Sequence, residues 1–141
     1  VMDSVHPGGL GGTYTGNPGA CAAAMAAIDW MESNDACALA RSIEAVLVAG
    51  LRDIAAEDPS LGDIRGRGAM IAIEVVDPGT GAPDAARAVG VSKRCHQDGV
   101  LTLVTGTYGN VIRFLPPLSI PPAALEDAVS VVMAAFAAQN A

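Results

Sequence analysis

Positive charge is scarce in this sequence of 141 residues. It holds eight lysines and arginines, of which Lys93 is the only lysine, against fifteen acidic residues, and the net charge is −7. A nucleic-acid partner requires clustered basic side chains, so this composition excludes one. Charged residues of both signs make up only 16% of the chain. Soluble domains commonly carry about 25%.

Long apolar runs are also missing. The longest, at residues 20–28 and 129–138, reach about half of the ~20 residues that a membrane-spanning helix requires. We therefore expect no membrane partner and, without a recognisable signal peptide, a cytoplasmic location. The three cysteines, Cys21, Cys37 and Cys95, are odd in number and widely spaced. This pattern predicts buried free thiols rather than a disulfide framework or a metal site.

Apolar and small residues are what the sequence has in abundance. Hydrophobic residues make up 51% of it, which excludes disorder and predicts one domain. Six glycines fall within GGLGGTYTGNPG at residues 8–19. A flexible linker is one interpretation, but Leu10, Tyr14 and Pro18 favour a structured loop that leads into a helix. Its threonines and bare amides are typical of an anion site at a helix start.

The remaining pattern predicts alternating helices and strands. Asn17 is suited to cap a helix that has Pro18 at its first position. The other expected elements are a helix at 36–56, a strand at 68–76, a helix from Asp84 to Gly99, strands at 100–104 and 111–115, and a last helix from Pro121. This order predicts an α/β fold of the α+β kind, with helices on one side of a three-stranded, mainly antiparallel sheet.

Several familiar catalytic motifs are absent from the sequence. The Gly-Lys-Ser/Thr end of a phosphate-binding loop is missing, because Lys93 follows Ser92. His6 and His96 have no second ligand at metal spacing, so no metal site is expected. By motif alone, no enzyme is demonstrated.

Arg113 needs an explanation, because it lies among apolar residues in the expected strand VIRFL at residues 111–115. A guanidinium buried there requires a partner. One hypothesis is a salt bridge to Glu74 or simple exposure on one face of the sheet. The other is that Arg113 binds a carboxylate ligand with both guanidinium nitrogens.

Three segments carry a resemblance to a known family. They are GGLGGTYTGNPGACAAAMAAID, DIRGRGAMIAIEV and GVLTLVTGTYGNVIRFLPPLSI. In order and spacing they resemble the C-terminal part of class III aminotransferases of fold type I, which depend on pyridoxal 5'-phosphate. The last segment is similar to that of bacterial 4-aminobutyrate transaminases in particular.

The resemblance implies roles for three residues. Thr13 would bind the cofactor phosphate of the neighbouring subunit, with Gly12 offering a backbone amide. Arg113 would bind the substrate carboxylate. The implied partners are an amino acid, a 2-oxo acid and further copies of the chain, as a dimer or a dimer of dimers that includes a large domain. No metal is implied.

The same resemblance implies that the chain is part of a longer polypeptide. Residues 1–16 would end the large domain in a cofactor and interface loop, 17–33 would form a connecting helix, and 34–141 the small domain. Lys93 lies in a region that matches a surface helix, so the lysine that forms the Schiff base would precede Val1. We therefore expect no catalytic residue in this chain, and the isolated chain to be inactive and without cofactor.

Two classes of function remain open. One is a portion of a 4-aminobutyrate:2-oxoglutarate transaminase with a ping-pong mechanism, or of a related enzyme for ornithine, β-alanine, 5-aminovalerate or diaminobutyrate. The other is a non-catalytic module that folds or dimerises alone.

Overall fold

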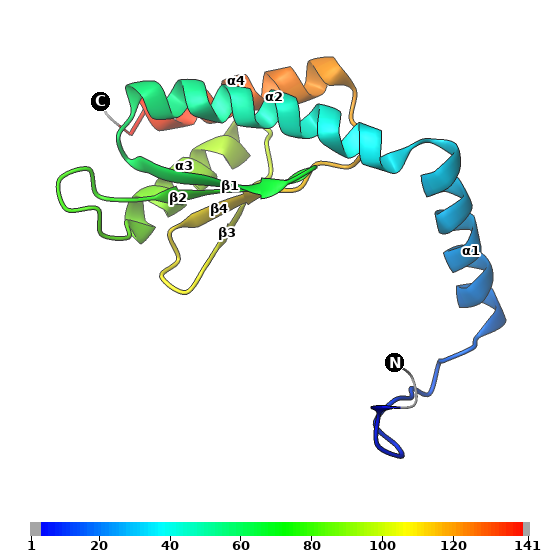
Figure 1. Cartoon of the computed structure of the whole chain (residues 1–141). Coiled ribbons are helices and arrows are strands. Elements are labelled where there is room, and N and C mark those ends of the chain that lie inside the picture. Colours follow the sequence, from blue (N-terminus) through cyan, green and yellow to red (C-terminus); the bar gives the residue numbers. More distant parts are fainter. Residues whose placement is uncertain (1–3, 140–141) are drawn as a thin grey trace. The chain divides into compact units, whose positions relative to one another are not determined.

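The computed structural model describes residues 4–139, which form four helices and four strands (Figure 1). In chain order the elements are α1 (Pro18–Ser33), α2 (Ala36–Glu57), β1 (Leu61–Arg67), β2 (Met70–Val75), α3 (Ala85–Gln97), β3 (Leu103–Thr105), β4 (Val111–Phe114) and α4 (Pro122–Ala137). The chain divides into two compact units, Val1–Ala36 and Cys37–Ala141, and each is described by itself. Among residues 4–139, no helix has the length and apolar character needed to cross a membrane.

The first unit consists of the glycine-rich loop and α1. The side-chain oxygen of Asn17 accepts a hydrogen bond from the Ala20 amide at 3.1 Å, and Pro18 occupies the first turn. The predicted start of this helix is therefore confirmed. Proline suits this position because its missing N–H would have no partner inside the helix.

The second unit is built on an antiparallel sheet with the strand order β1-β2-β4-β3. The predicted hairpin between residues 100 and 115 is confirmed as β3 and β4, with Leu103 opposite Arg113 and Thr105 opposite Val111. The prediction of three strands is wrong, because β1 is a fourth. Its sequence, LGDIRGR, has two glycines and three charged residues, so it lacks the apolar alternation that marks most strands.

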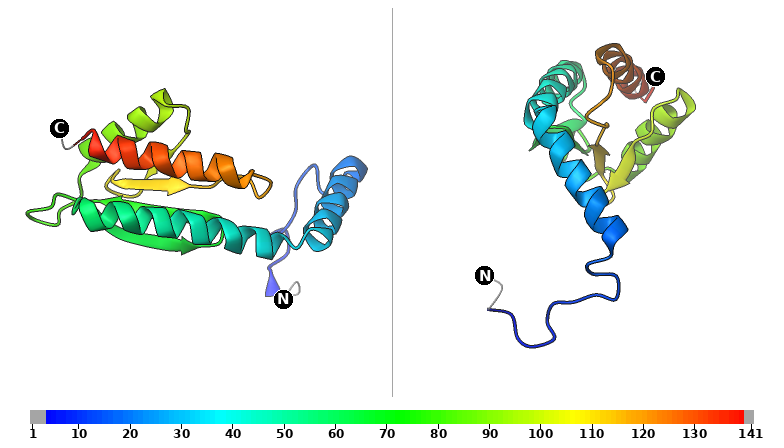
Figure 2. Two further views of the ribbon diagram at one scale, coloured as in Figure 1. Left: turned by 90° about the horizontal axis from the view of Figure 1, so that it is seen from above. Right: turned by 90° about the vertical axis from the view of Figure 1, so that its right-hand side faces the viewer.

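Helices α2, α3 and α4 cover one face of this sheet, as the two views of Figure 2 show. Strand residues alternate in burial, so that Ile71, Ile73 and Val75 are at most 1% exposed while Met70 is 54% exposed. Each of the three helices buries one of its sides against these strands. The largest fully buried apolar side chains of this core are Phe136, Leu51, Ile71, Ile73, Ile112, Val75, Val91 and Cys95.

The prediction of three buried thiols is wrong for two of them. Cys21 and Cys37 are exposed and Cys95 is buried, and all three are free. No residue of α1 is buried, and Cys37 lies on the exposed side of the first turn of α2. The apolar composition around both cysteines did not indicate this exposure. Burial raises the pKa of the Cys95 thiol to about 11.

Hydrogen bonds to loop amides and strand carbonyls fix the hairpins of the second unit. The Glu44 carboxylate on α2 accepts a hydrogen bond from the Gly68 amide at 2.6 Å, in the turn between β1 and β2. The buried Asn110 donates its side-chain amide to the Val75 carbonyl at 3.0 Å, just before β4 begins. Both contacts join segments far apart in sequence: the first joins α2 to the turn between β1 and β2, and the second joins the start of β4 to the end of β2.

Candidate functional site

The candidate site lies on the face of the sheet opposite to helices α2, α3 and α4, called here the outer face. It is defined by a row of four residues that are paired across neighbouring strands: Arg65, Ala72, Arg113 and Leu103. Successive side chains of a strand point to opposite faces. Because Ile112 and Phe114 are buried in the core, Arg113 between them projects from the outer face.

Arg113 is half-buried and without a recorded partner. Within residues 4–139 no hydrogen bond or ion pair of its guanidinium is present. The first hypothesis named a salt bridge to Glu74 or a position on one face of the sheet: the salt bridge is not formed, since Glu74 pairs with Arg65, whereas the position on one face agrees with the structure. A half-buried guanidinium that keeps its five donors available is suited to bind an anionic ligand with two parallel hydrogen bonds.

A shallow hollow of about 270 Å³ surrounds the Arg113 side chain. Besides Arg113, its lining residues are Leu101, Thr102, Leu103 and Leu115. Leu101 is 88% exposed and Leu115 is 61% exposed, so Arg113 shares the hollow with exposed apolar side chains. A ligand that combines a carboxylate with a short methylene chain matches this arrangement of one charge within apolar walls.

A polar cluster fixes the wall of this hollow at Thr102. The Thr102 hydroxyl lies 2.8 Å from the Ser92 hydroxyl, and both residues are buried. The Nε2 atom of His96 lies 2.9 Å from the Thr102 carbonyl oxygen and 3.1 Å from its backbone nitrogen. These contacts tie the segment before β3 to α3. Sequence reasoning missed this role of His96, because the contact depends on the close return of the chain after α3.

Arg65 makes the ion pairs that Arg113 lacks. Its guanidinium lies 2.7 Å from the Asp63 carboxylate and 2.7 Å from the Glu74 carboxylate. These two hydrogen bonds raise the pKa of Arg65 above its ordinary value. Sequence reasoning missed Arg65 because β1 was not predicted. The alternation of charges at 63, 65 and 67 was the signal that could have indicated a strand with one charged face.

The predicted cofactor contacts, Gly12 and Thr13, lie in the first unit. The Gly12 carbonyl accepts a hydrogen bond from the Thr15 amide at 3.0 Å, which closes a turn around Thr13. In the described part of the loop, the Thr13 hydroxyl and the amides of residues 10–14 donate no hydrogen bond. A phosphate group requires several such donors, so this donor set fits one.

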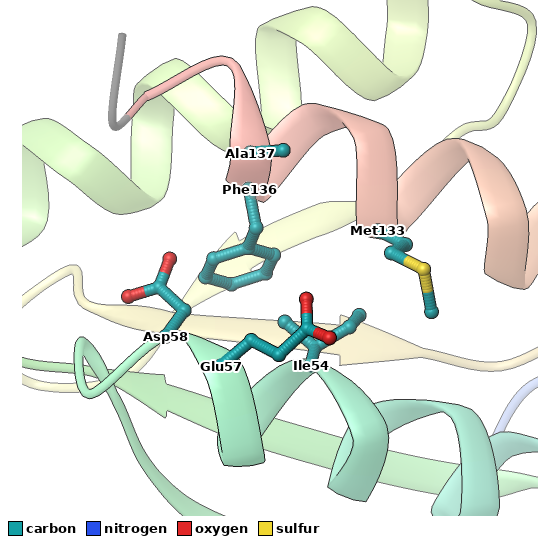
Figure 3. A pocket seen from close by; sticks show the side chains of 6 residues that line it. All are labelled: Ile54, Glu57, Asp58, Met133, Phe136 and Ala137. Atoms are coloured by element: carbon teal, nitrogen blue, oxygen red, sulfur yellow. The ribbon is translucent and has the colours of Figure 1, made fainter.

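A second hollow, of about 210 Å³, lies where α2 and α4 end (Figure 3). Figure 3 shows the Phe136 ring beside the carboxylates of Glu57 and Asp58. Asp58 is already bound to the Arg87 guanidinium at 3.0 Å and to the Ser60 amide at 2.9 Å. These contacts join α3 to the end of α2, so we interpret Asp58 as a structural residue.

Lys93 is exposed on α3, one of the helices that cover the face of the sheet opposite to the hollow. An exposed ammonium on a helix surface lacks the desolvated pocket in which a catalytic lysine acts as a nucleophile.

Known proteins resemble this chain in sequence and in fold. The sequence profile of the family Aminotransferase class-III matches residues 1–136. The chain belongs to the class III aminotransferases. A 4-aminobutyrate aminotransferase of Mycobacterium tuberculosis is 45% identical over 137 residues, which are 97% of this chain and 30% of that relative. A 5-aminovalerate aminotransferase of Pseudomonas putida is 43% identical over 136 residues, which are 96% of this chain and 32% of that relative.

Solved structures agree with this family assignment. An ornithine aminotransferase from Toxoplasma gondii superposes with a TM-score of 0.80 at 33% identity, over 98% of this chain and 31% of that chain. An amine transaminase from an uncultivated Pseudomonas species, in its PLP-bound form, superposes with a TM-score of 0.80 at 34% identity, over 92% of this chain and 29% of that chain. The chain thus spans about a third of the length of the class III aminotransferases that it matches.

Proposed function

We propose that this chain supplies the substrate-carboxylate site, and one contact to the cofactor phosphate, of a 4-aminobutyrate:2-oxoglutarate transaminase. The observation that carries the proposal is the unpaired, half-buried Arg113 on the outer face. The identity to 4-aminobutyrate aminotransferases supports the choice of substrate. The complete enzyme would be the full polypeptide that carries this chain, loaded with pyridoxal 5'-phosphate and assembled as a homo-oligomer; we refer to it below as the holoenzyme.

A closely related substrate is the second candidate. The chain is 43% identical to a 5-aminovalerate aminotransferase, and 5-aminovalerate is one methylene longer than 4-aminobutyrate. Both are ω-amino acids with a single carboxylate, so Arg113 would bind either one. The length of the apolar path between Arg113 and the reacting amine would decide which substrate is preferred. The preference would be modest, because one methylene contributes only about 1–3 kcal/mol of discrimination.

In the mechanism, Arg113 would bind the substrate carboxylate and orient the substrate. Its guanidinium would hold the carboxylate of 4-aminobutyrate in one half-reaction and a carboxylate of 2-oxoglutarate in the other. The side chains of Leu101, Leu103 and Leu115 around it would exclude water from the methylene chain. Holding one end of the substrate fixes where its amino or keto end lies.

Thr13 and Gly12 would hold the cofactor by its phosphate. The Thr13 hydroxyl and the neighbouring amides are free donors in the described part of the loop. When bound, pyridoxal phosphate supplies the aldehyde that carries the amino group and the electron sink that lets a proton leave the substrate carbon. Lys93 is exposed on α3, so we expect the 141-residue chain by itself to show no turnover.

The test of the proposal is steady-state kinetics of Arg113→Ala in the holoenzyme. We expect KM for both 4-aminobutyrate and 2-oxoglutarate to rise by about tenfold or more, because a charge-assisted hydrogen-bonded pair contributes about 1.5–3 kcal/mol. The melting temperature should change little, because the Arg113 guanidinium makes no hydrogen bond or ion pair within residues 4–139. Arg94→Ala is the matched control, since Arg94 is an arginine with a surface ion pair to Asp98 on α3. Unchanged KM values in Arg113→Ala would overturn the proposal.

A further inference from the structure

We propose that Arg65 is a positioning residue that holds Glu74 and thereby keeps Arg113 free to bind a carboxylate. The inference rests on the proposed function of Arg113 and adds a residue that the resemblance does not assign. Its basis is the pairing of β1, β2 and β4, which places one carboxylate between two arginines.

The register makes both Arg65 and Arg113 diagonal neighbours of Glu74. Ala72 on β2 is the partner of Arg65 on β1 and also of Arg113 on β4. Glu74 lies two residues further along β2 and therefore on the same face as Ala72. Each arginine is diagonal to Glu74 across one strand pair, a separation of about 7–8 Å that long side chains can bridge.

Arg65 is the arginine that holds this carboxylate. One guanidinium nitrogen of Arg65 lies 2.7 Å from Glu74 Oε1, and the other lies 2.7 Å from Asp63 Oδ2. Asp63 is itself the strand partner of Glu74, so the guanidinium is held between two acidic residues of adjacent strands. Two bonds in one plane orient it more firmly than a single bond would.

The small side chain of Ala72 leaves the path between the two arginines open. Nothing on β2 stands between Glu74 and either guanidinium, because Ala72 occupies the position that faces both. If Arg65 were lost, Glu74 would keep one guanidinium within reach, that of Arg113. An incoming carboxylate would then have to displace Glu74, and apparent affinity would fall.

A purely structural role of Arg65 predicts a different behaviour. The side chains of Arg65 and Asp63 are about half exposed and that of Glu74 is 37% exposed. Ion pairs with this exposure contribute little to stability. A structural role would therefore show itself as a small loss of stability with KM unchanged, whereas the positioning role raises KM only while Glu74 is charged.

The experiment compares Arg65→Gln, Glu74→Gln and the double variant in the holoenzyme, with 2-oxoglutarate as the probe. Arg65→Gln should raise KM by about two- to fivefold, the strength of an exposed ion pair, with kcat nearly unchanged. Glu74→Gln should have a KM at or below that of the wild type. The double variant should return to the wild-type KM, because no carboxylate is left to compete for Arg113.

Arg94→Gln is the matched control, because Arg94 is similarly exposed and bound to one carboxylate, on α3. It should leave KM unchanged. A crystal structure of Arg65→Gln should in addition show the Glu74 carboxylate within 4 Å of the Arg113 guanidinium, the limit for an ion pair.

Two results would overturn the inference: a KM of Arg65→Gln equal to that of the wild type, or a double variant as impaired as Arg65→Gln. Both remain distinct from failure of the proposed function, in which Arg113→Ala itself would leave KM unchanged. The crystal structure of Arg65→Gln tests whether Glu74 moves to Arg113, whether or not the holoenzyme has the proposed activity.

Discussion

The availability of Arg113 results from its neighbours rather than from the residue itself. Ile112 and Phe114 on either side are 0% and 8% exposed, and they fix the strand by burying their side chains under the helices. Arg113 is thereby held on the outer face at a defined position. An arginine on a mobile loop would lose side-chain and backbone entropy on binding a carboxylate, whereas here the backbone entropy is lost on folding.

Thr13 offers a second prediction at the scale of single residues. Replacing Thr13 by valine keeps the shape of the side chain but removes the hydroxyl that would bind the cofactor phosphate. Because a hydrogen bond to a charged group contributes about 1.5–3 kcal/mol, we expect the Kd for pyridoxal phosphate to rise about tenfold or more. Titration of the full polypeptide, freed of its cofactor, with pyridoxal phosphate measures this Kd through the change in absorbance.

The control for Thr13 comes from the same loop. Thr15→Val removes a hydroxyl two residues away, in the same exposed turn. Its effect on the Kd should be clearly smaller. An equal loss in both variants would show that the loop responds as a whole and that Thr13 has no special contact.

At the scale of elements, periodicity predicted most of the second unit. Helix α2 follows its apolar stripe through Ile43, Leu47, Leu51 and Ile54, all of which are buried. The helix expected from Asp84 is confirmed as α3, which Asp84 caps by accepting a hydrogen bond from the Arg87 amide at 2.9 Å. Such signals are local, so a single sequence contains them.

Strand β1 was not predictable in the same way. Its residues are mostly exposed, and it is an edge strand that pairs only with β2. Its conformation depends on backbone hydrogen bonds to β2 and on Gly66, which has a φ of +145°. A side chain at Gly66 would also overlap the Met70 carbonyl. Strand β1 has no alternation of apolar residues, and its only periodic signal is the charge at 63, 65 and 67, so the contacts of Arg65 were missed as well.

The packing of α2 on α4 gives a prediction at this scale. Gly50 on α2 is buried, and a methyl group there would overlap the Val129 side chain on α4. Gly50→Ala should therefore destabilise the chain by about 1–3 kcal/mol, although alanine is the better helix former. Urea unfolding of the 141-residue chain measures this change.

Combining Gly50→Ala with Val129→Ala tests whether the contact with Val129 causes this loss of stability. In a Val129→Ala background the overlapping methyl groups are gone, so Gly50→Ala should cost markedly less than in the wild type. An equal cost in both backgrounds would show that the contact with Val129 is not what excludes a side chain at position 50.

At the scale of the whole molecule, the low charge of the chain is accompanied by exposed apolar side chains. Leu101, Leu103 and Leu115 on the outer face are at least half exposed, and so are Met25 and Met31 on α1. Apolar surface of this kind is typical of faces that are covered in a larger assembly. It agrees with a chain that spans about a third of the length of its class III relatives.

The central claim, that Arg113 binds a substrate carboxylate, is tested most directly by a pair of amines that differ only at that group. In n-butylamine a methyl group replaces the carboxylate of 4-aminobutyrate. The single-turnover kcat/KM of the holoenzyme for each amine can be followed through the absorbance of the cofactor. The comparison separates loss of the carboxylate contact from general damage to the enzyme.

For Arg113→Gln, the account predicts that kcat/KM for 4-aminobutyrate falls by about 30-fold or more, as expected when one partner of a buried, hydrogen-bonded charge pair is removed. The value for n-butylamine should remain within about threefold of that of the wild type, because this amine has no carboxylate for Arg113 to bind. Equal losses for the two amines, or no loss for 4-aminobutyrate, would contradict the account.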